Sequence, residues 1–215
     1  FRLLYDRLRR IAEVGDRTGS GPEVISRLRL LVSGGAALSA DLYQSYKDIG
    51  LTVYEGYGLT ETAPILTVNP PDNSRPASVG KPLPGIEIRI DKPDSEGCGE
   101  IVVQGPNVMA GYYENPDASA EYLRGGWLYT GDIGRIDSEN YLYITGRSKD
   151  LIVTGAGKNV YPDEVESFYA SVPFIQEFRI VGVHSPESMS EDVHAILVPD
   201  WEAYTGPRDT DAFRS

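Results

Sequence analysis

Two short apolar runs, each followed by a glycine-containing turn, lie on either side of a helical pattern near the start of the chain. Residues 28–32 lead into the turn at 33–37, and residues 51–53 lead into the turn at 54–61. Between them, residues 39–49 carry apolar side chains on one helical face, behind a serine suited to cap the helix. This order predicts an α/β layer, in which ligands bind outside the carboxyl ends of the strands. Both glycine turns are therefore expected to face one crevice.

A proline-rich stretch separates this part from a β-rich part. Six prolines lie between residues 64 and 85. Proline disfavours helices and central strands, so this stretch is interpreted as an ordered connection. Beyond it, isoleucines alternate with charged residues over 86–91, which is typical of a half-buried strand. Further strands are predicted at 101–103, 128–136 and 141–145, forming a small distorted barrel or sheet.

The last part of the chain mixes strand and helix patterns. A strand-like run at 151–153 precedes a glycine-containing loop, and Pro162 suits the first turn of a helix. Two more strands are predicted at 178–183 and 193–198. The apolar stripe of the predicted helix comprises Val165, Phe168, Tyr169 and Val172.

Composition excludes several classes of protein. The 215 residues carry a formal net charge of -12, which argues against nucleic acid and against an anionic membrane surface. Cys98 is the single cysteine, so an internal disulfide is impossible and a reducing, cytoplasmic location is expected. No apolar run approaches the roughly 20 residues of a membrane helix, although peripheral contact with a membrane stays open. The chain does not begin with Met, and we expect it to be part of a longer protein.

The turn at 54–61 carries side chains with distinct chemistry. Gly56 and Gly58 permit close approach of a ligand to the backbone. Tyr57 offers an aromatic face, Thr60 a hydroxyl, and Glu61 the hard oxygen that Mg²⁺ prefers. A base, a phosphate and a metal ion would all fit such a turn, and so would an ordinary strand-to-loop connection with no ligand.

Four separated motifs occur in one order. They are Val32-Ser33-Gly34-Gly35-Ala36, Gly56-Tyr57-Gly58-Leu59-Thr60-Glu61, Tyr129-Thr130-Gly131-Asp132 and Gly146-Arg147-Ser148-Lys149-Asp150. Together they resemble the adenylate-forming superfamily of acyl-CoA synthetases, luciferases and peptide-synthetase adenylation domains. Two further segments, 79–85 and 105–113, are most similar to those of bacterial long-chain fatty acid–CoA ligases.

The resemblance implies a fold and a domain order. Residues 1–70 would be the C-terminal part of a doubly wound α/β subdomain, and residues 71–148 a small β-barrel-like subdomain. Residues 149–215 would begin a mobile, truncated α+β domain. A phosphate-gripping loop upstream and a late catalytic lysine downstream are absent, so the chain alone is expected to be inactive.

The resemblance also implies a reaction and its residues. A fatty acid would attack ATP to give acyl-AMP and pyrophosphate, with Mg²⁺, and coenzyme A would then displace AMP. Thr60, Glu61 and Lys149 would serve catalysis, with Glu61 holding the metal and Lys149 acting as a hinge between domains. The nucleotide-binding set would be Gly34, Gly35, Ala36, Glu55, Gly56, Tyr57, Gly58, Thr60, Asp132 and Arg147. The loop with Gly155, Gly157 and Lys158 would line the thiol channel.

Two other functions remain open at this point. One is an adenylation domain that loads a carrier protein, and the other is a nucleotide-binding module without catalysis. Each position also has an ordinary structural interpretation. Asp132 could stabilise a turn, Arg147 and Lys149 could be surface charges, and Lys158 could be a solvated loop lysine. Acyl chain length and oligomeric state do not follow from the sequence.

Overall fold

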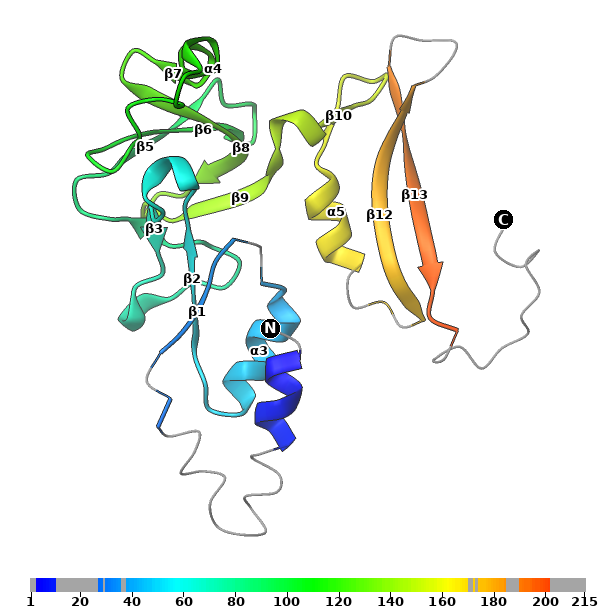
Figure 1. The fold of residues 1–215 in the computed structure, drawn as a ribbon. Helices are drawn as coiled ribbons and strands as arrows, with labels where there is room; N and C mark the ends of the chain where they lie inside the picture. The colour runs from blue at the N-terminus through cyan, green and yellow to red at the C-terminus, as the bar shows by residue number, and fades with distance from the viewer. Residues whose placement is uncertain are drawn as a thin grey trace. The chain divides into compact units, whose positions relative to one another are not determined.

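The computed structural model divides the chain into two compact units, Phe1–Lys149 and Asp150–Ser215. It describes residues 3–10, 27–28, 30–35, 38–169, 172, 174–184 and 190–201. Figure 1 shows the fold of the chain.

The first unit begins with the predicted α/β layer. Strands β1 (Leu31–Ser33) and β2 (Val53–Tyr57) are parallel neighbours, and helix α3 (Ala40–Asp48) connects them. Ser39 caps α3 as predicted, since its side chain accepts a hydrogen bond from the Leu42 backbone N–H. Residues 3–10 form a further helix, which lies beside α3 in Figure 1.

The core of this layer lies between the two helices and the strands. Its buried members are Leu8, Leu38, Leu42, Tyr46, Leu51 and Val53. The first strand departs from the prediction, because it starts at Leu31 instead of residue 28. The unbroken apolar run at 28–32 is typical of a buried strand, but Val32 is 52% exposed. Successive side chains of a strand point to opposite faces, so Leu31 packs against this core while Val32 points away from it.

The proline-rich connection extends the sheet. Strand β3 (Thr67–Val68) pairs antiparallel with β2, and β4 (Lys81–Pro82) pairs with β3. The sheet therefore has the order β1-β2-β3-β4. Two 3-10 turns, η1 (Thr60–Thr62) and η2 (Pro71–Asn73), flank β3. Pro82 lies on β4, the edge strand of this sheet, where a residue without a backbone N–H is tolerated.

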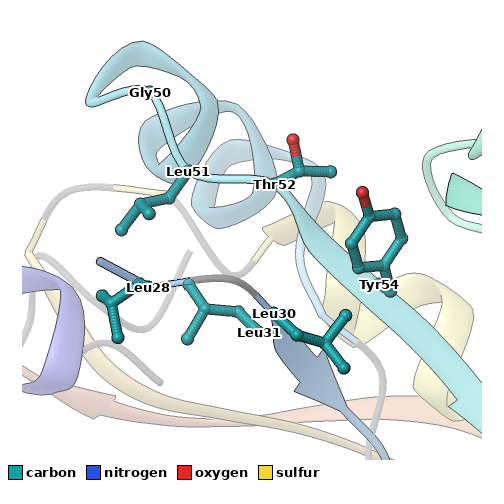
Figure 2. Close-up of a pocket in the computed structure, with 7 residues that line it drawn as sticks. All are labelled: Leu28, Leu30, Leu31, Gly50, Leu51, Thr52 and Tyr54. Atoms are coloured by element: carbon teal, nitrogen blue, oxygen red, sulfur yellow. The ribbon is translucent and has the colours of Figure 1, made fainter. Parts of the chain in front are cut away.

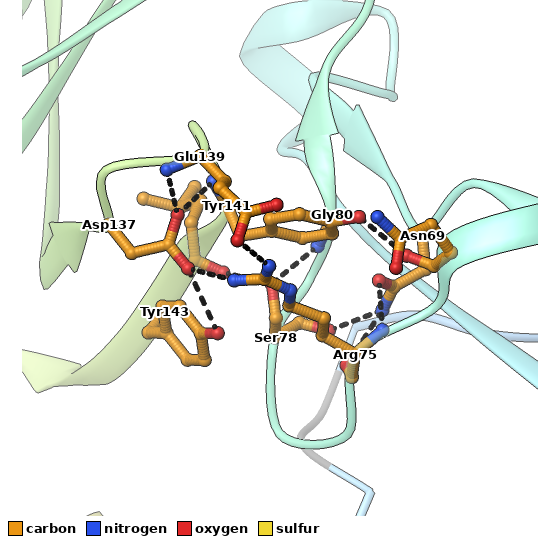
Figure 3. A network of polar contacts seen from close by, with 10 residues as sticks. Asn69, Arg75, Ser78, Gly80, Asp137, Glu139, Tyr141 and Tyr143 are labelled. Atoms are coloured by element: carbon orange, nitrogen blue, oxygen red, sulfur yellow. Dashed lines mark hydrogen bonds and ion pairs between the residues drawn. The ribbon is translucent and has the colours of Figure 1, made fainter.

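A polar network fixes this connection against the β-rich part (Figure 3). Arg75 Nη1 lies 2.6 Å from Asp137 Oδ2, and its other terminal nitrogen contacts Glu139. The guanidinium carbon lies 4.2 Å from the centre of the Tyr141 ring, which is fully buried. Asn69 is also buried and bonds both to the Arg75 backbone and to the Ser78 carbonyl. The connection is therefore ordered, as predicted, through contacts about 60 residues apart in sequence.

The β-rich part is one antiparallel sheet. It has the order β5-β6-β8-β7, with β9 paired to β8. The strands are β5 (Glu87–Asp91), β6 (Gly99–Gln104), β7 (Leu123–Arg124), β8 (Trp127–Ile136) and β9 (Leu142–Arg147). Its core is the second large cluster, with Tyr57, Leu66, Ile101, Val103, Leu128 and Leu142 buried. Every strand predicted in this region is present.

One helix in this region was not predicted. Helix α4 (Pro116–Tyr122) follows Asn115, whose side chain accepts a hydrogen bond from the Ala118 backbone N–H. Proline at the first helical position and asparagine at the cap are both standard start signals. The α4 segment joins β6 to β7.

The second unit pairs a long hairpin with one helix. Strands β10 (Ile152–Val153) and β11 (Asn159–Val160) form a small ladder, and 3-10 turn η3 (Ser148–Asp150) precedes them. Strands β12 (Ile175–His184) and β13 (Glu191–Pro199) are antiparallel. Helix α5 (Pro162–Tyr169) starts at the predicted proline.

The predicted apolar stripe of α5 is not a buried face. Phe168 is 80% exposed, and Tyr169 and Val172 are also exposed. Tyr169 still packs against Phe178 of β12, with ring centroids 5.2 Å apart, and the contact between α5 and β12 also includes a polar side chain. Glu166 accepts a hydrogen bond from the Ile180 backbone N–H at 2.8 Å and pairs with Arg179 at 2.9 Å.

Candidate functional site

The two glycine-containing segments lie side by side at the carboxyl ends of β1 and β2. The second departs from the prediction of a turn over 54–61, because residues 54–57 belong to strand β2. A Cβ on Gly34 would lie 3.5 Å from the Gly56 carbonyl oxygen, so the two segments are close neighbours. A Cβ on Gly58 would lie 1.8 Å from the Pro64 carbonyl oxygen. The packing of the chain on itself therefore requires glycine at position 58, independently of any ligand.

A buried carboxylate joins this turn to the β-rich sheet. Asp132 is 5% exposed, and its Oδ2 accepts a hydrogen bond from the Tyr57 hydroxyl at 2.6 Å. Its Oδ1 lies 3.2 Å from Arg147 Nε. The register of the sheet makes this possible, since Asp132 on β8 pairs directly with Arg147 on β9. Three predicted site residues are thus in contact.

The Tyr57 hydroxyl is a permanent donor in this arrangement. Burial raises the pKa of Tyr57, and the neighbouring carboxylate of Asp132 raises it further. The tyrosine is 8% exposed and belongs to the core cluster of the β-rich part. Most of its ring therefore packs against protein, and little of it is open to solvent.

Glu61 is held by a segment far along the chain. It lies in η1, and its Oε1 accepts a hydrogen bond from the Tyr112 hydroxyl at 3.0 Å. The backbone N–H of Met109 donates to the Glu61 carbonyl oxygen at 2.8 Å. Thr60, immediately before it, is exposed. A hydroxyl and a carboxylate therefore stand next to each other directly after the second glycine turn.

Glu55 is a second buried carboxyl group, two residues before Tyr57 on β2. It is 5% exposed, and its Oε1 accepts a hydrogen bond from the Leu38 backbone N–H at 3.2 Å. Its Oε2 has no hydrogen-bond partner among the described residues. Burial raises the pKa of Glu55 above its ordinary value, and the bond from Leu38 opposes this in part.

The remaining predicted positions are more open. Gly35 is exposed with a φ of +81°, a conformation that favours glycine. Lys149 is exposed at the end of the first unit. Gly155, Gly157 and Lys158 belong to the second unit, in the exposed turn between β10 and β11. Ala36 lies outside the described residues.

The described residues contain no cluster of three or more His, Cys, Asp or Glu side chains that could hold a metal ion. Within the described residues, Glu61 is therefore not part of a cage of three or more such side chains. This fits Mg²⁺, which keeps several waters and binds through one or two carboxylates together with substrate phosphates. Among the same residues, no helix has the length and apolar character needed to cross a bilayer.

A separate small pocket lies at the opposite ends of the strands (Figure 2). It has a volume of about 190 Å³. Its lining residues are Leu28, Leu30, Leu31, Gly50, Leu51, Thr52 and Tyr54. These residues stand where β1 and β2 begin, whereas ligands of open α/β sheets bind where strands end. The pocket is therefore distinct from the candidate site.

Tyr112 has a side chain that contacts the site, although the sequence did not identify it as a site residue. It lies in the 105–113 segment, which the sequence analysis linked to bacterial long-chain fatty acid–CoA ligases without assigning any of its residues to the site. Glu61 and Tyr112 are 51 positions apart, so no local spacing rule connects them. The sequence offers one weak signal for Tyr112: it follows Gly111 directly, in a segment without a clear helix or strand pattern.

Glycine-containing segments at the carboxyl ends of neighbouring parallel strands, followed by a hydroxyl and carboxylates, are typical of α/β proteins that bind nucleotides. Comparison with known families gives the narrower assignment. Residues 4–113 match the family described as AMP-binding enzyme, and the chain belongs to this family.

Three known proteins illustrate the similarity. A feruloyl-CoA synthase of Amycolatopsis sp. is 40% identical over 81% of this chain and 37% of its own length. A long-chain-fatty-acid–CoA ligase of Mycobacterium bovis is 40% identical over 83% of this chain and 28% of its own length. The structure of an o-succinylbenzoate–coenzyme A synthetase from Bacillus subtilis, in complex with ATP and a magnesium ion, superimposes with a TM-score of 0.73. It is 30% identical and covers 88% of this chain and 44% of that one. The chain thus spans less than half of the proteins it matches.

Proposed function

We propose that this chain is part of an AMP-forming CoA ligase. The complete enzyme would activate a carboxylic acid as acyl-AMP, releasing pyrophosphate, and then transfer the acyl group to the thiol of coenzyme A. The observation that carries this proposal is the buried Asp132 carboxylate, which two side chains from other strands hold in one orientation.

The geometry of Asp132 suits the ribose of a nucleotide. A carboxylate has two oxygens, and each accepts more than one hydrogen bond, so bonds to Tyr57 and Arg147 leave acceptor capacity on both. Two adjacent ribose hydroxyls match this spacing. Hydrogen bonds to an ionised acceptor are roughly twice as strong as neutral ones, which favours nucleotide binding at a fixed, largely desolvated carboxylate.

Thr60 and Glu61 are the candidates for the phosphate side of the site. Thr60 would donate to the α-phosphate, and Glu61 would supply one oxygen to Mg²⁺. A bound Mg²⁺ neutralises charge on the phosphate oxygens. The protein's own contribution is positioning, because the reaction places charge on oxygens whose donors must already be oriented.

The second step would use the second unit. We assign Gly155, Gly157 and Lys158, in the exposed turn between β10 and β11, to the path of the coenzyme A thiol. Lys149 would be the hinge about which this unit moves. The division into 1–70, 71–148 and 149–215 is the domain organisation that goes with this proposal.

The acid that is activated is proposed only as a class. A fatty acid is favoured by the long-chain ligase among the relatives and by the segments at 79–85 and 105–113. Other relatives at about the same identity are named for ferulate and 2-succinylbenzoate. An adenylation domain that loads a carrier protein is the alternative within the family, and a nucleotide-binding module without catalysis is the alternative outside it.

The test is ATP–pyrophosphate exchange by the full-length ligase with a panel of fatty, aromatic and dicarboxylic acids. Exchange with long-chain acids, followed by thioester formation with coenzyme A, is the expected result. Tight AMP binding without exchange would favour the non-catalytic alternative.

Asp132→Ala is the matched variant for this experiment. It removes a charged acceptor of about two hydrogen bonds, and each is worth about 1.5–3 kcal/mol. The dissociation constant for ATP should therefore rise at least about a hundredfold, since every 1.4 kcal/mol is a factor of ten. Arg135→Ala, on the same strand with its guanidinium over the Tyr143 ring, is the control. Unchanged ATP affinity in Asp132→Ala would remove Asp132 from the site.

A further inference from the structure

The segment after β6, residues 105–113, contacts the 3-10 turn η1, which carries Glu61, at several points. Met109 donates its backbone N–H to the Glu61 carbonyl oxygen. The side-chain amide of Asn107 donates to the Thr62 carbonyl oxygen at 2.7 Å and to that of Ile65 at 3.0 Å. These three bonds fix the backbone of η1 and of the chain that follows it. The orientation of the Glu61 side chain is a separate matter, because backbone bonds do not determine it.

Tyr112 is the residue that bonds the Glu61 side chain. Its hydroxyl donates to Glu61 Oε1 at 3.0 Å. The tyrosine is itself fixed, since its backbone N–H donates to Ser119 Oγ at 2.9 Å. Its ring packs edge-on against Tyr122, with centroids 5.9 Å apart. Residues from the middle and the end of α4 therefore hold the donor in place.

We propose that Tyr112 is a positioning residue for the cation: its hydroxyl takes one acceptor position on Oε1 of Glu61, competes there with a cation, and so favours binding of the cation through Oε2 alone. This inference rests on the proposed function, in which Glu61 is the ligand of Mg²⁺. No hydrogen bond to Oε2 is found within the described residues. The hydroxyl and the metal would thus share the carboxylate, one on each oxygen.

The consequence is a preference for one kind of cation. Mg²⁺ requires near-ideal octahedral geometry with short bonds, which one carboxylate oxygen can satisfy. Ca²⁺ is larger and accepts a carboxylate through both oxygens. A hydroxyl bound to Oε1 opposes the two-oxygen mode and therefore favours Mg²⁺ over Ca²⁺.

The experiment measures ATP binding by the full-length ligase without an acid substrate, so that no turnover occurs. Calorimetric titrations are made with Mg²⁺, with Ca²⁺ and with EDTA. Tyr112→Phe removes only the hydroxyl, and Tyr113→Phe makes the same change at the neighbouring, 89% exposed tyrosine. Loss of a hydrogen-bond partner behind a metal ligand typically lowers metal affinity by about tenfold or more. Tyr112→Phe should lose about tenfold in Mg²⁺-supported affinity and less with Ca²⁺, while Tyr113→Phe behaves as wild type.

Two further variants separate the possible failures. Glu61→Gln should abolish the difference between Mg²⁺ and EDTA, and its failure to do so would refute the proposed metal role of Glu61 itself. Ser119→Ala loosens the Tyr112 backbone and keeps its hydroxyl, so a smaller shift in the same direction is expected. An effect of Glu61→Gln with Tyr112→Phe indistinguishable from Tyr113→Phe would overturn the positioning role alone. An equal loss with Mg²⁺ and Ca²⁺ in Tyr112→Phe would overturn the single-oxygen mode.

Discussion

Glu55 shows how one residue can lower the stability of the fold. Its carboxyl group is buried beside the first glycine turn, with one oxygen hydrogen-bonded to Leu38 and the other without a described partner. Burial penalises the charged form, so the pKa of Glu55 is raised in the folded protein. Folding therefore costs free energy at any pH where the unfolded chain would leave this carboxyl ionised.

The sign of the pH dependence follows from this shift. A group whose folded pKa lies above its unfolded pKa adds stability below the unfolded pKa, and that stability is lost as pH rises through the folded pKa. Glu55→Gln cannot ionise and still accepts the bond from Leu38. We expect it to stabilise the protein by about 1 kcal/mol at pH 7, the low end of the cost of an unsatisfied buried polar group. The gain should shrink toward zero as pH falls to about 4.

Urea unfolding of the wild type and Glu55→Gln between pH 4 and pH 8 measures this difference. Glu87→Gln is the control, because Glu87 lies on β5 with a side chain that is 65% exposed. A gain that is constant across the pH range would show that the charge of Glu55 is not its cause.

At the scale of elements, the connection from β3 to β4 depends on one buried amide. Asn69 is 2% exposed; its amide donates to the carbonyls of Ser78 and Arg75, and its oxygen accepts the Arg75 backbone N–H. This amide positions Arg75 for its pairs with Asp137 and Glu139 (Figure 3). The order of the proline-rich stretch thus comes from one short polar side chain and the guanidinium that it places.

Asn69→Ala would leave a buried N–H and two carbonyl groups without this partner. Because each unsatisfied buried group costs about 1–3 kcal/mol and water relieves part of the loss, we expect destabilisation of about 2–3 kcal/mol. Thermal unfolding measures it. Asn73→Ala, at an exposed position in η2 of the same connection, should change stability by less than about 0.5 kcal/mol. Similar melting temperatures for the two variants would contradict the role given to Asn69.

Features set within one turn of chain were predictable, such as the Ser39 cap and the start of α5 at Pro162. Burial was not, because it depends on the neighbouring element: Val32 and Phe168 both have apolar side chains and both are exposed.

In the candidate site, too, local motifs were predictable and contacts between distant segments were not. Motif order identified Tyr57, Asp132 and Arg147, which the structure brings into contact. The bond between Tyr112 and Glu61 joins two loops that only the fold brings together, and a one-dimensional pattern contains no record of it. The packing need for Gly58 was hidden for the same reason, since its neighbour Pro64 has no regular spacing from it.

At the scale of the whole molecule, the division between the two compact units falls between Lys149 and Asp150. These two residues lie in the short 3-10 turn η3, and Lys149 is exposed. A short exposed turn between two separately packed units is where a change of backbone angles disturbs the fewest contacts. We therefore propose this turn as the hinge if the two half-reactions need two arrangements of the units.

Lys149→Pro tests this role, because proline fixes φ near −65° and removes one backbone donor. In the full-length ligase we expect formation of acyl-AMP to stay within about twofold, while thioester formation slows by about tenfold or more, or about 1.4 kcal/mol of barrier. ATP–pyrophosphate exchange reports the first half-reaction, and thioester formation from supplied acyl-AMP and coenzyme A reports the second. Lys149→Ala keeps a free φ and removes only the charge, so it should leave thioester formation largely intact. If both half-reactions fall equally in Lys149→Pro, or if Lys149→Ala matches it, the residue acts through its charge or through folding, and the two units do not need to move about this turn.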